Sequence, residues 1–397
     1  MLNKIKSSEN NCYMPCFSRL NLCITHGEGA VLYDTNGKDY IDFLAGIATN
    51  SLGYNHPKLT AAIASQASKL IHISNLVYNE PQSKLVDTLI TNTIFDRVFL
   101  SNSGAEANEC AVKLIRKYFY ARHEERYKII TATGSFHGRT MATLTLTGQP
   151  KYSKPFAPYL PAVEYVPYND FGALKAAVDD NTAAIILEPI QGESGVIVPN
   201  YQYMVDAYAL SRRAGILFGL DEIQTGIGRT GRMFAFEHYG ITPDIVTLAK
   251  GLAGGVPIGA TLARGPVATA FEPGDHGSTF GGNPLASSAA NVVLDYVLDS
   301  NFLSEITAKG EHLRNRLRAL KKYEWVKDIR GMGLMLGIEL DPTVKNTEIQ
   351  SRLMGHGILV GTAGNNTVRL VPPYVITTAQ IDRLYEVLES TFASINI

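Results

Sequence analysis

Three short apolar runs in the middle of the chain constrain its fold more than any other feature. They span residues 184–188, 216–221 and 245–250, and each ends in a charged residue. Segments with helical spacing of apolar residues separate them. Uninterrupted β-branched and aliphatic runs of this length are typical of strands buried on both faces of a mostly parallel sheet. The sequence therefore predicts an α/β fold in which helices cover such a sheet.

The chain of 397 residues is too long for one compact core, so we expect two domains. We predict a large domain over residues 51–285. A smaller α+β domain would combine an N-terminal segment, 1–50, with a C-terminal part, 286–397. Apolar runs on either side of a Gly-containing turn at 35–38 predict a β-hairpin near the N-terminus. A helical stretch from Pro284 towards residue 323 and a strand over 333–339 complete the expected organisation.

Composition excludes several functional classes. The formal net charge is −1 and no Lys/Arg-rich run is present, which argues against nucleic acid or an anionic membrane as partner. No apolar run is long enough to span a bilayer, and the polar start lacks the apolar stretch of a secretory signal. We therefore expect a cytoplasmic protein. Cys12, Cys16 and Cys23 cluster, but only His26 could be a nearby fourth ligand, so we expect no metal site.

Residues 101–109 predict an anion site at the start of a helix. Ser103 and Glu106 have the S-x-x-E spacing of a capping box. Gly104 and Ala105 leave the first backbone N–H groups uncovered, where the helix dipole favours a phosphate. The helical face that would be buried comprises Ala107, Cys110, Ala111, Leu114 and Ile115. A well-capped surface helix without a ligand is the alternative at this point.

The segment 226–231 formally fits the G-x-G-x-x-G pattern of dinucleotide-binding proteins. That pattern should open the helix directly after a strand, but five residues, 221–225, intervene here. No long amphipathic helix follows it either. We therefore do not assign a nucleotide site to this segment.

Asp221 and Lys250 each end an apolar run, and ligands of open α/β sheets bind beyond the carboxyl ends of the strands. A carboxylate buried there needs a cation, and a lysine buried there loses its proton easily. A pyridine cofactor with a protonated ring nitrogen and an aldehyde satisfies both requirements. An ordinary Asp–Lys ion pair is the alternative interpretation.

Taken together, the motifs resemble those of the class III aminotransferases, which depend on pyridoxal 5′-phosphate (PLP). The resemblance covers nearly the whole chain. Its seven motifs follow one another at compatible spacings, at residues 102–109, 136–140, 188–193, 221–226, 248–251, 276–284 and 369–373. It implies the fold type I architecture, with a mostly parallel seven-stranded sheet in the large domain. It also implies a homodimer whose active sites lie at the subunit interface.

By matching position, the resemblance implies that Lys250 binds the aldehyde of PLP and shuttles protons. It implies that Asp221 holds the pyridinium and that Gln224 lies near the ring hydroxyl. The other cofactor-binding residues that it implies are Ser103, Gly104 and Ala105 at the phosphate, Phe136 on the ring face, His137, Glu188, and Thr279 from the other subunit.

The resemblance assigns the substrate side to fewer residues. Arg139 would bind the carboxylate distal to the reacting amine, for which a guanidinium fork is suited. Arg369 would bind the α-carboxylate of glutamate or 2-oxoglutarate, and Glu193 would pair with it while an ω-amine substrate is bound. Ser278 would also line the substrate site. Ile47 stands where ornithine aminotransferases have a tyrosine, which favours a substrate whose α-amine is capped.

The expected reaction is therefore transfer of the δ-amino group of N-acetylornithine to 2-oxoglutarate in a ping-pong cycle, as in arginine biosynthesis. Succinylornithine, succinyldiaminopimelate, free ornithine and 4-aminobutyrate are alternative amino donors. A PLP racemase or aminomutase is disfavoured because Arg139, Glu193 and Arg369 together suit two substrates. A regulator with an aminotransferase-like domain would need a DNA-binding module, for which the chain has no segment of suitable charge.

Overall fold

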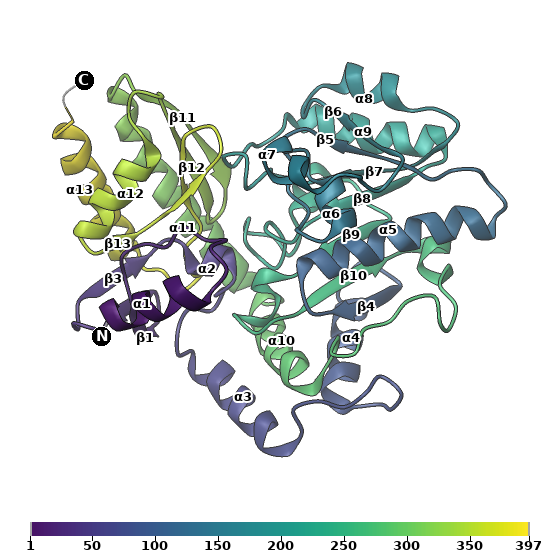
Figure 1. The fold of residues 1–397 in the computed structure, drawn as a ribbon, viewed down its shortest axis with the longest axis horizontal. Helices are drawn as coiled ribbons and strands as arrows, with labels where there is room; N and C mark the ends of the chain where they lie inside the picture. Colours follow the sequence, from purple (N-terminus) through teal and green to yellow (C-terminus); the bar gives the residue numbers. More distant parts are fainter. Residues whose placement is uncertain (1, 396–397) are drawn as a thin grey trace.

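A seven-stranded sheet forms the centre of the larger part of the molecule in the computed structural model, which describes residues 2–395 (Figure 1). The strand order is β4-β10-β9-β8-β7-β5-β6. All neighbours are parallel except β10, which is antiparallel to both β4 and β9. The bounds are β4 (Arg97–Ser101), β5 (Lys128–Ala132), β6 (Val163–Val166), β7 (Thr182–Leu187), β8 (Leu217–Asp221), β9 (Ile245–Leu248) and β10 (Gly259–Ala263). The predicted α/β class with a mostly parallel sheet is confirmed.

The three apolar runs form the central strands β7, β8 and β9, and every residue of these strands is buried. One detail of the prediction is wrong. Strand β9 ends at Leu248, so Lys250 does not close it but begins a short 3-10 helix, η3 (Lys250–Ala253). Lys250 has a positive φ of 37°, because the chain turns sharply after the strand. This turn places the lysine beyond the strand ends, where a ligand is expected.

Helices pack on this sheet. Helix α5 (Gly104–Ala121) lies against β4, β9 and β10, and α9 (Tyr201–Ala214) lies against β7 and β8. The predicted buried face of α5 is confirmed, because all five of its residues are buried. Further helices of this part include α3 (Pro57–Lys69), α4 (Glu80–Thr91), α6 (Met141–Leu146), α7 (Pro150–Ser153) and α8 (Phe171–Ala177).

The smaller part of the molecule contains two four-stranded sheets, ordered β1-β2-β3-β13 and β11-β12-β15-β14. The predicted hairpin is present as the antiparallel pair β2 (Val31–Asp34) and β3 (Asp39–Asp42). Strand β3 also pairs in parallel with β13 (Ile358–Leu359), which joins the two ends of the chain in one sheet. The other strands are β1 (Ile24–Glu28), β11 (Val326–Met332), β12 (Met335–Leu340), β14 (Gly361–Ala363) and β15 (Thr367–Leu370). The predicted strand over 333–339 corresponds to β12.

The helical stretch after residue 283 is divided into α10 (Pro284–Val297) and α11 (Ser300–Arg318). The division occurs at Asp299, whose side chain accepts a hydrogen bond from the backbone N–H of Asn301 and caps the second helix. Helix α10 packs against α3 and α4, whereas α11 packs against α13 (Thr378–Ala393) of the smaller part. Helix α12 (Asn346–Gly355) lies beside β13.

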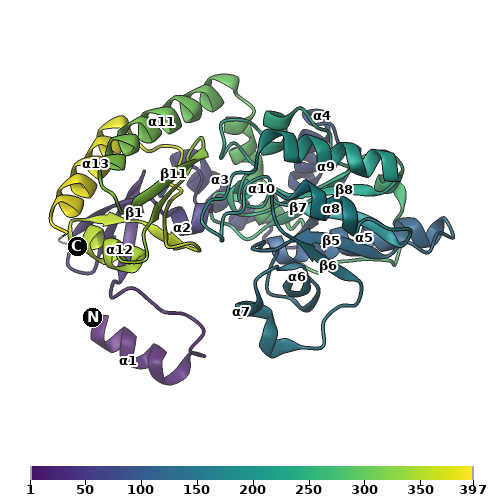
Figure 2. The ribbon, with the colours of Figure 1, turned by 90° about the horizontal axis from the view of Figure 1, so that it is seen from above.

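The N-terminal helix α1 (Leu2–Cys12) stands apart from the rest of the chain and has no buried residue (Figure 2). Several large apolar side chains beyond it are also exposed, among them Met14 and Phe17. Among residues 2–395, none of the helices combines the length and the apolar character needed to cross a bilayer.

Candidate active site

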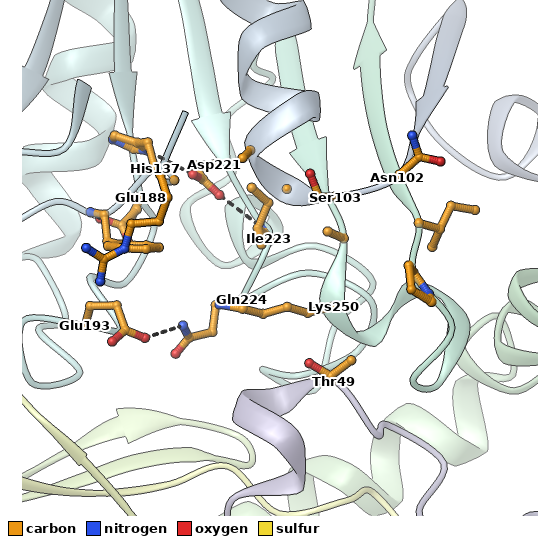
Figure 3. Close-up of a pocket in the computed structure, with 18 of the residues that line it drawn as sticks. Thr49, Asn102, Ser103, His137, Glu188, Glu193, Asp221, Ile223, Gln224 and Lys250 are labelled. Atoms are coloured by element: carbon orange, nitrogen blue, oxygen red, sulfur yellow. Dashed lines mark hydrogen bonds and ion pairs between the residues drawn. The ribbon is translucent and has the colours of Figure 1, made fainter. Parts of the chain in front are cut away.

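A cavity of about 400 Å³ lies beyond the carboxyl ends of β7, β8 and β9. This volume is within the usual range of small-molecule sites. Figure 3 shows that its polar residues converge from the strand ends, the start of α5 and the N-terminal segment. The predicted residues that line it are Ser103, Gly104, Ala105, Phe136, His137, Arg139, Glu188, Glu193, Asp221, Gln224 and Lys250.

The start of α5 forms one wall of the cavity. Ser103 is the N-cap residue, and its Oγ accepts a hydrogen bond from the N–H of Glu106 at 3.2 Å. The carboxylate of Glu106 does not complete a capping box, because it accepts the N–H of Asn102 instead, at 2.5 Å. The N–H groups of Gly104 and Ala105 have no acceptor within the helix and lie at the cavity. This end of the cavity can therefore bind a phosphate.

Hydrogen bonds link the carboxylate of Asp221 to three other side chains, in a set that we name the Asp221 network: Asn108, His137, Asp221 and Thr247. Asp221 Oδ2 accepts from Asn108 Nδ2 at 2.8 Å and from His137 Nδ1 at 2.7 Å. Its Oδ1 accepts the N–H of Ile223 at 3.0 Å. All four members are buried. A carboxylate held in this way can stabilise a cationic ring nitrogen in the cavity.

Lys250 and Glu188 are buried ionisable groups beside this network. Burial lowers the pKa of the Lys250 amine, and the charges of Glu193 and Asp221 offset this only in part. The amine is thus closer to the uncharged form that a nucleophile needs. Burial also raises the pKa of Glu188 well above its usual range, and the charge of Asp221 adds to the shift. The Glu188 carboxyl accepts one hydrogen bond, from the N–H of Phe136 at 3.1 Å.

A second buried set, the Arg369 cluster, comprises Glu193, Gln224 and Arg369. Arg369 Nη1 donates to Glu193 Oε1 at 2.5 Å and to Gln224 Oε1 at 3.2 Å. The Arg369 side chain is 2% exposed and that of Glu193 is 22% exposed. Burial tends to raise the pKa of Glu193, but the charges of Arg369 and Lys250 bring it below its usual value. The cluster joins β15 of the smaller part to the loop after β7.

Gln224 therefore lies in the Arg369 cluster as well as at the cavity. Its Nε2 donates to Glu193 Oε1 at 3.4 Å (Figure 3). A Cβ on Gly192 would come within 2.2 Å of Gln224 Oε1, so a larger residue there would push the Gln224 amide away from Arg369 and Glu193.

Arg139 lies at the mouth of the cavity and is exposed. Its guanidinium lies 4.1 Å from the ring centroid of Tyr152 and 5.4 Å from that of Phe136. No carboxylate within residues 2–395 forms an ion pair with it, so the fork remains available for an anionic group of a ligand. Stacking on two rings holds the guanidinium without neutralising its charge.

Four of the predicted site residues do not line the cavity of their own chain: Ile47, Ser278, Thr279 and Arg369, the last of which lies behind Glu193 and Gln224. Ser278 Oγ accepts from Asn102 Nδ2 at 3.1 Å, which joins it to a cavity residue. Thr279 is exposed. Ile47 is 43% exposed.

Ile47 lies in an unusual turn, α2 (Ala45–Ala48), in which all four residues have positive φ, between 49° and 64°. Such backbone is strained for residues other than glycine, and most of all for a β-branched residue. Asp42 holds the start of the turn, because its carboxylate accepts the N–H groups of Leu44 and Ala45 at 2.7 and 2.9 Å. The turn leads directly to Thr49, which lines the cavity.

Sequence reasoning missed several residues of the site. Asn108 and Thr247 were not singled out, because a polar residue on a buried helix face or strand gives no signal of its partner. Thr49, Asn102 and Tyr152 were missed because no local pattern shows that these part-exposed residues meet at one cavity. The S-x-x-E pattern could have indicated Asn102, since an N-terminal carboxylate commonly binds a nearby backbone N–H.

Comparison with known proteins identifies the family. The model of the family Aminotransferase class-III matches residues 15–392. The chain belongs to the class III aminotransferases. It is 48% identical over 389 residues to an acetylornithine aminotransferase of Caldanaerobacter subterraneus subsp. tengcongensis, with 98% of each chain covered. As a member of this family it is a PLP-dependent aminotransferase.

Solved structures agree. The chain is similar to the ornithine aminotransferase of Toxoplasma gondii whose structure has partial occupancy of PLP at the active site. The TM-score is 0.95 at 34% identity, with 100% of this chain and 95% of the other covered. It is also similar to an N-acetylornithine aminotransferase of Stenotrophomonas maltophilia K279a, with a TM-score of 0.83, 35% identity, and 98% and 100% coverage.

The cavity fits PLP by its donor set. A phosphate fits the N–H groups at the start of α5, and a pyridinium fits the Asp221 carboxylate. An aldehyde fits the Lys250 amine, whose pKa burial lowers. Gly104 and Ile223 both line the cavity and pack closely, because a Cβ on Gly104 would meet Ile223 Cδ1 at 2.7 Å.

Proposed function

We propose that the enzyme transfers the δ-amino group of N-acetylornithine to 2-oxoglutarate, giving N-acetylglutamate 5-semialdehyde and glutamate. The curated relative from Caldanaerobacter and the Stenotrophomonas structure carry acetylornithine activity in their names. The observation that carries the proposal is the part-buried Glu193–Arg369 pair, with Nη1 and Oε1 2.5 Å apart, beside Lys250. A paired arginine offers no charge to an ω-amine substrate, but a dicarboxylate can displace Glu193 and bind the guanidinium. One cavity can then serve both half-reactions.

We propose the following roles for the cofactor-binding residues. PLP, when bound, supplies an aldehyde that carries the amino group and a ring that withdraws electrons. The N–H groups of Gly104 and Ala105, with the Ser103 side chain, bind the phosphate. Asp221 holds the proton on the ring nitrogen, and Phe136 packs on the ring face. The residues His137, Glu188 and Gln224 complete this set.

Lys250 is the proposed catalytic base as well as the covalent anchor. With the cofactor bound, its Nζ would accept the proton from the carbon that bears the reacting amine, hold it, and return it in the later part of the transfer. Burial lowers the pKa of this amine, which favours the uncharged form that accepts a proton.

Arg139 would bind the carboxylate at the far end of N-acetylornithine. It is stacked on Tyr152 and lacks a protein carboxylate within the described chain, which supports a role in binding an anion. Ile47 would lie near the acylated α-amine, where an apolar side chain offers no partner to a free ammonium group. Ser278 would shape the same region through Asn102.

The test is a single-turnover measurement with the PLP-loaded enzyme and no keto acid. N-acetylornithine, succinylornithine, ornithine and 4-aminobutyrate are added separately, and the absorbance change that marks amination of the cofactor is followed. We expect N-acetylornithine to react fastest. If it is inert while ornithine or 4-aminobutyrate reacts, the substrate assignment is wrong although the enzyme class stands.

We also propose a homodimer in which Thr279 of each chain completes the cofactor site of the other. The segment around Thr279 adjoins exposed apolar side chains, including Leu76, Tyr78 and Phe280. Asn75 connects the two, because its Nδ2 donates to the carbonyls of Ser278 and Gly281 at 3.1 and 2.9 Å. An apolar surface beside an active site is typical of a subunit interface.

Subunit mixing tests this proposal. In a hybrid of a Lys250→Ala chain and a Thr279→Ala chain, donation of Thr279 across the interface leaves one site fully intact. The hybrid should therefore regain activity that neither homodimer has. If Thr279 served its own chain, the hybrid would contain no intact site and would stay as weak as the Thr279→Ala enzyme.

A cytoplasmic location remains part of the proposal. The four cysteines form no disulfide with one another, and three of them lie at or near the surface. Free thiols in such positions suit a reducing compartment.

A further inference from the structure

We infer that Asn108 is a positioning residue that fixes which oxygen of Asp221 faces the cofactor. This inference rests on the proposed role of Asp221. Asn108 lies on the buried face of α5, is 2% exposed, and does not line the cavity. It is therefore not placed to contact a ligand in the cavity and would act through its neighbour Asp221.

The amide of Asn108 uses all its hydrogen-bonding groups inside the protein. Its Nδ2 donates to Asp221 Oδ2 at 2.8 Å and to the carbonyl of His137 at 2.8 Å. Its Oδ1 accepts the hydroxyl of Thr247 at 2.8 Å. Because a hydroxyl of Thr247 donates to one end and an ionised carboxylate accepts at the other, the amide has only one satisfactory orientation.

His137 completes the arrangement on the same oxygen. An ionised carboxylate cannot donate, so His137 Nδ1 carries the proton and donates to Asp221 Oδ2 at 2.7 Å. The other ring nitrogen then accepts from Thr131 Oγ1 at 3.2 Å. Two donors therefore occupy Oδ2. Within residues 2–395, Oδ1 accepts only the N–H of Ile223, at 3.0 Å, and keeps a lone pair for a cation in the cavity.

Each member of this chain of hydrogen bonds orients the next one. Thr247, on β9, orients the amide of Asn108 on α5, and the amide orients the carboxylate at the end of β8. Without the amide, His137 alone would hold Oδ2, and the carboxylate could rotate about its Cβ–Cγ bond. The cofactor would then bind a carboxylate that is less well oriented, and part of its binding energy would be lost in ordering it.

The experiment measures the dissociation constant of PLP from the holoenzyme by equilibrium dialysis. The melting temperature of each variant is measured in parallel as a separate readout of stability. We expect Asn108→Ala to weaken PLP binding by about tenfold or more, since hydrogen bonds to charged groups are the strong ones. Thr247→Val should weaken it by about threefold. The double variant should bind PLP no more weakly than Asn108→Ala, because Thr247 acts only through Asn108.

Thr261→Val is the matched control. Thr261 is a buried threonine on β10 whose hydroxyl donates to the carbonyl of Ala107, the neighbour of Asn108, at 2.7 Å. It supports the same helix without reaching Asp221. It should lower the melting temperature about as much as Thr247→Val and leave PLP affinity unchanged. If Thr261→Val and Thr247→Val weaken PLP equally, the inference is wrong.

Asn108→Asp provides a readout that a structural role would not give. The introduced carboxyl keeps the volume of the amide, and while protonated it can still donate to Asp221. Its single O–H cannot also reach the His137 carbonyl, and when ionised it has no hydrogen to donate and repels Asp221. Relative to the unmodified enzyme, its PLP affinity should fall as pH rises. A pH-independent ratio would overturn the inference. If Asp221→Ala also left PLP affinity unchanged, the proposed role of Asp221 would fail together with it.

Discussion

The Asp221 network and the Arg369 cluster are both buried and charged, yet they are built in different ways. The Asp221 network lies within the large sheet and its helices, and it uses nearly every donor and acceptor it contains. The Arg369 cluster joins β15 of the smaller part to a loop of the larger one, and Arg369 Nε is buried with no hydrogen-bond partner in the described part of the chain. The first is suited to hold one group permanently, and the second to exchange partners.

This difference corresponds to the two tasks of the proposed reaction. The cofactor stays bound through the whole cycle, so its partner carboxylate gains from being fixed by packed elements. The two substrates alternate, so their arginine gains from a carboxylate that can leave. An ion pair across two structural units can open with a small movement of either one, whereas the Asp221 network could change only by disrupting the sheet.

Lys250 stands between the two sets, and its removal should have the largest effect. Lys250→Ala should lower turnover by at least about 10⁴-fold, because covalent anchoring and proton transfer are lost together. The fold should survive, since a buried amine with a lowered pKa contributes little to stability. Steady-state kinetics with a melting curve checks both. Near-normal turnover in this variant would contradict the proposed mechanism.

Arg369→Ala tests the exchangeable cluster. The reaction with glutamate should slow by roughly 100-fold, because the α-carboxylate of the bound substrate would lose its charged partner. The reaction with N-acetylornithine should slow much less, because Arg369 is paired with Glu193 in that half. Rapid-reaction measurement of each half-reaction gives the two ratios. Arg316→Ala is a suitable control, because this arginine pairs with Asp382 between α11 and α13, away from the cavity and from the loop that carries Glu193. Equal losses in both halves would rule out the exchange of partners.

The contrast between the two sets also explains how much the sequence could predict. Asp221 and Ser103 follow from local pattern, because strand ends and helix caps are set by neighbours in the chain. Lys250 was found in the same way, although the turn after Leu248 was not foreseen. Arg369 came only from the family resemblance, since a lone arginine on a strand carries no signal of a partner 176 residues away.

Other features could not be predicted because tertiary packing creates them. Asn108 and Thr247 look like ordinary buried polar residues until α5 and β9 are packed together. The left-handed turn at Ala45–Ala48 contains one glycine among four positive φ angles, so the usual glycine signal of such backbone is nearly absent. Asp42, which holds this turn, precedes it by three residues and gives no local hint of its role.

Ile47→Tyr sharpens the comparison on the substrate side. A phenol there can offer a hydrogen bond to a free α-amine, so the ratio of N-acetylornithine to ornithine specificity should fall by about tenfold. The turn should tolerate the change, since tyrosine lacks the β-branching that makes isoleucine unfavourable at a φ of 64°. The kcat/KM for both substrates gives the ratio. An unchanged ratio would mean that Ile47 only packs.

The smallest effect concerns stability of the cofactor-free enzyme and its dependence on pH. The folded-state pKa of Lys250 is lowered, chiefly by burial, while the unfolded chain keeps the ordinary value of 10.5. Below the folded pKa both states bind the proton, and the folded state bears the cost of a buried charge. As pH rises through the window up to 10.5, the folded state releases its proton first, so stability increases.

Lys250→Met removes this charge and should therefore stabilise the cofactor-free protein more at about pH 6.5 than at about pH 10. The gain in melting temperature relative to the unmodified protein, measured at the two pH values, checks the sign. Lys309→Met is a useful comparison, because burial also lowers the pKa of Lys309, but its ammonium donates to the carbonyl of Tyr374 at 2.9 Å. That variant loses a hydrogen bond and should gain less. If the melting temperature of Lys250→Met rose equally at both pH values, burial would not be destabilising the charged form of Lys250. The argument that burial makes this amine reactive would then fail.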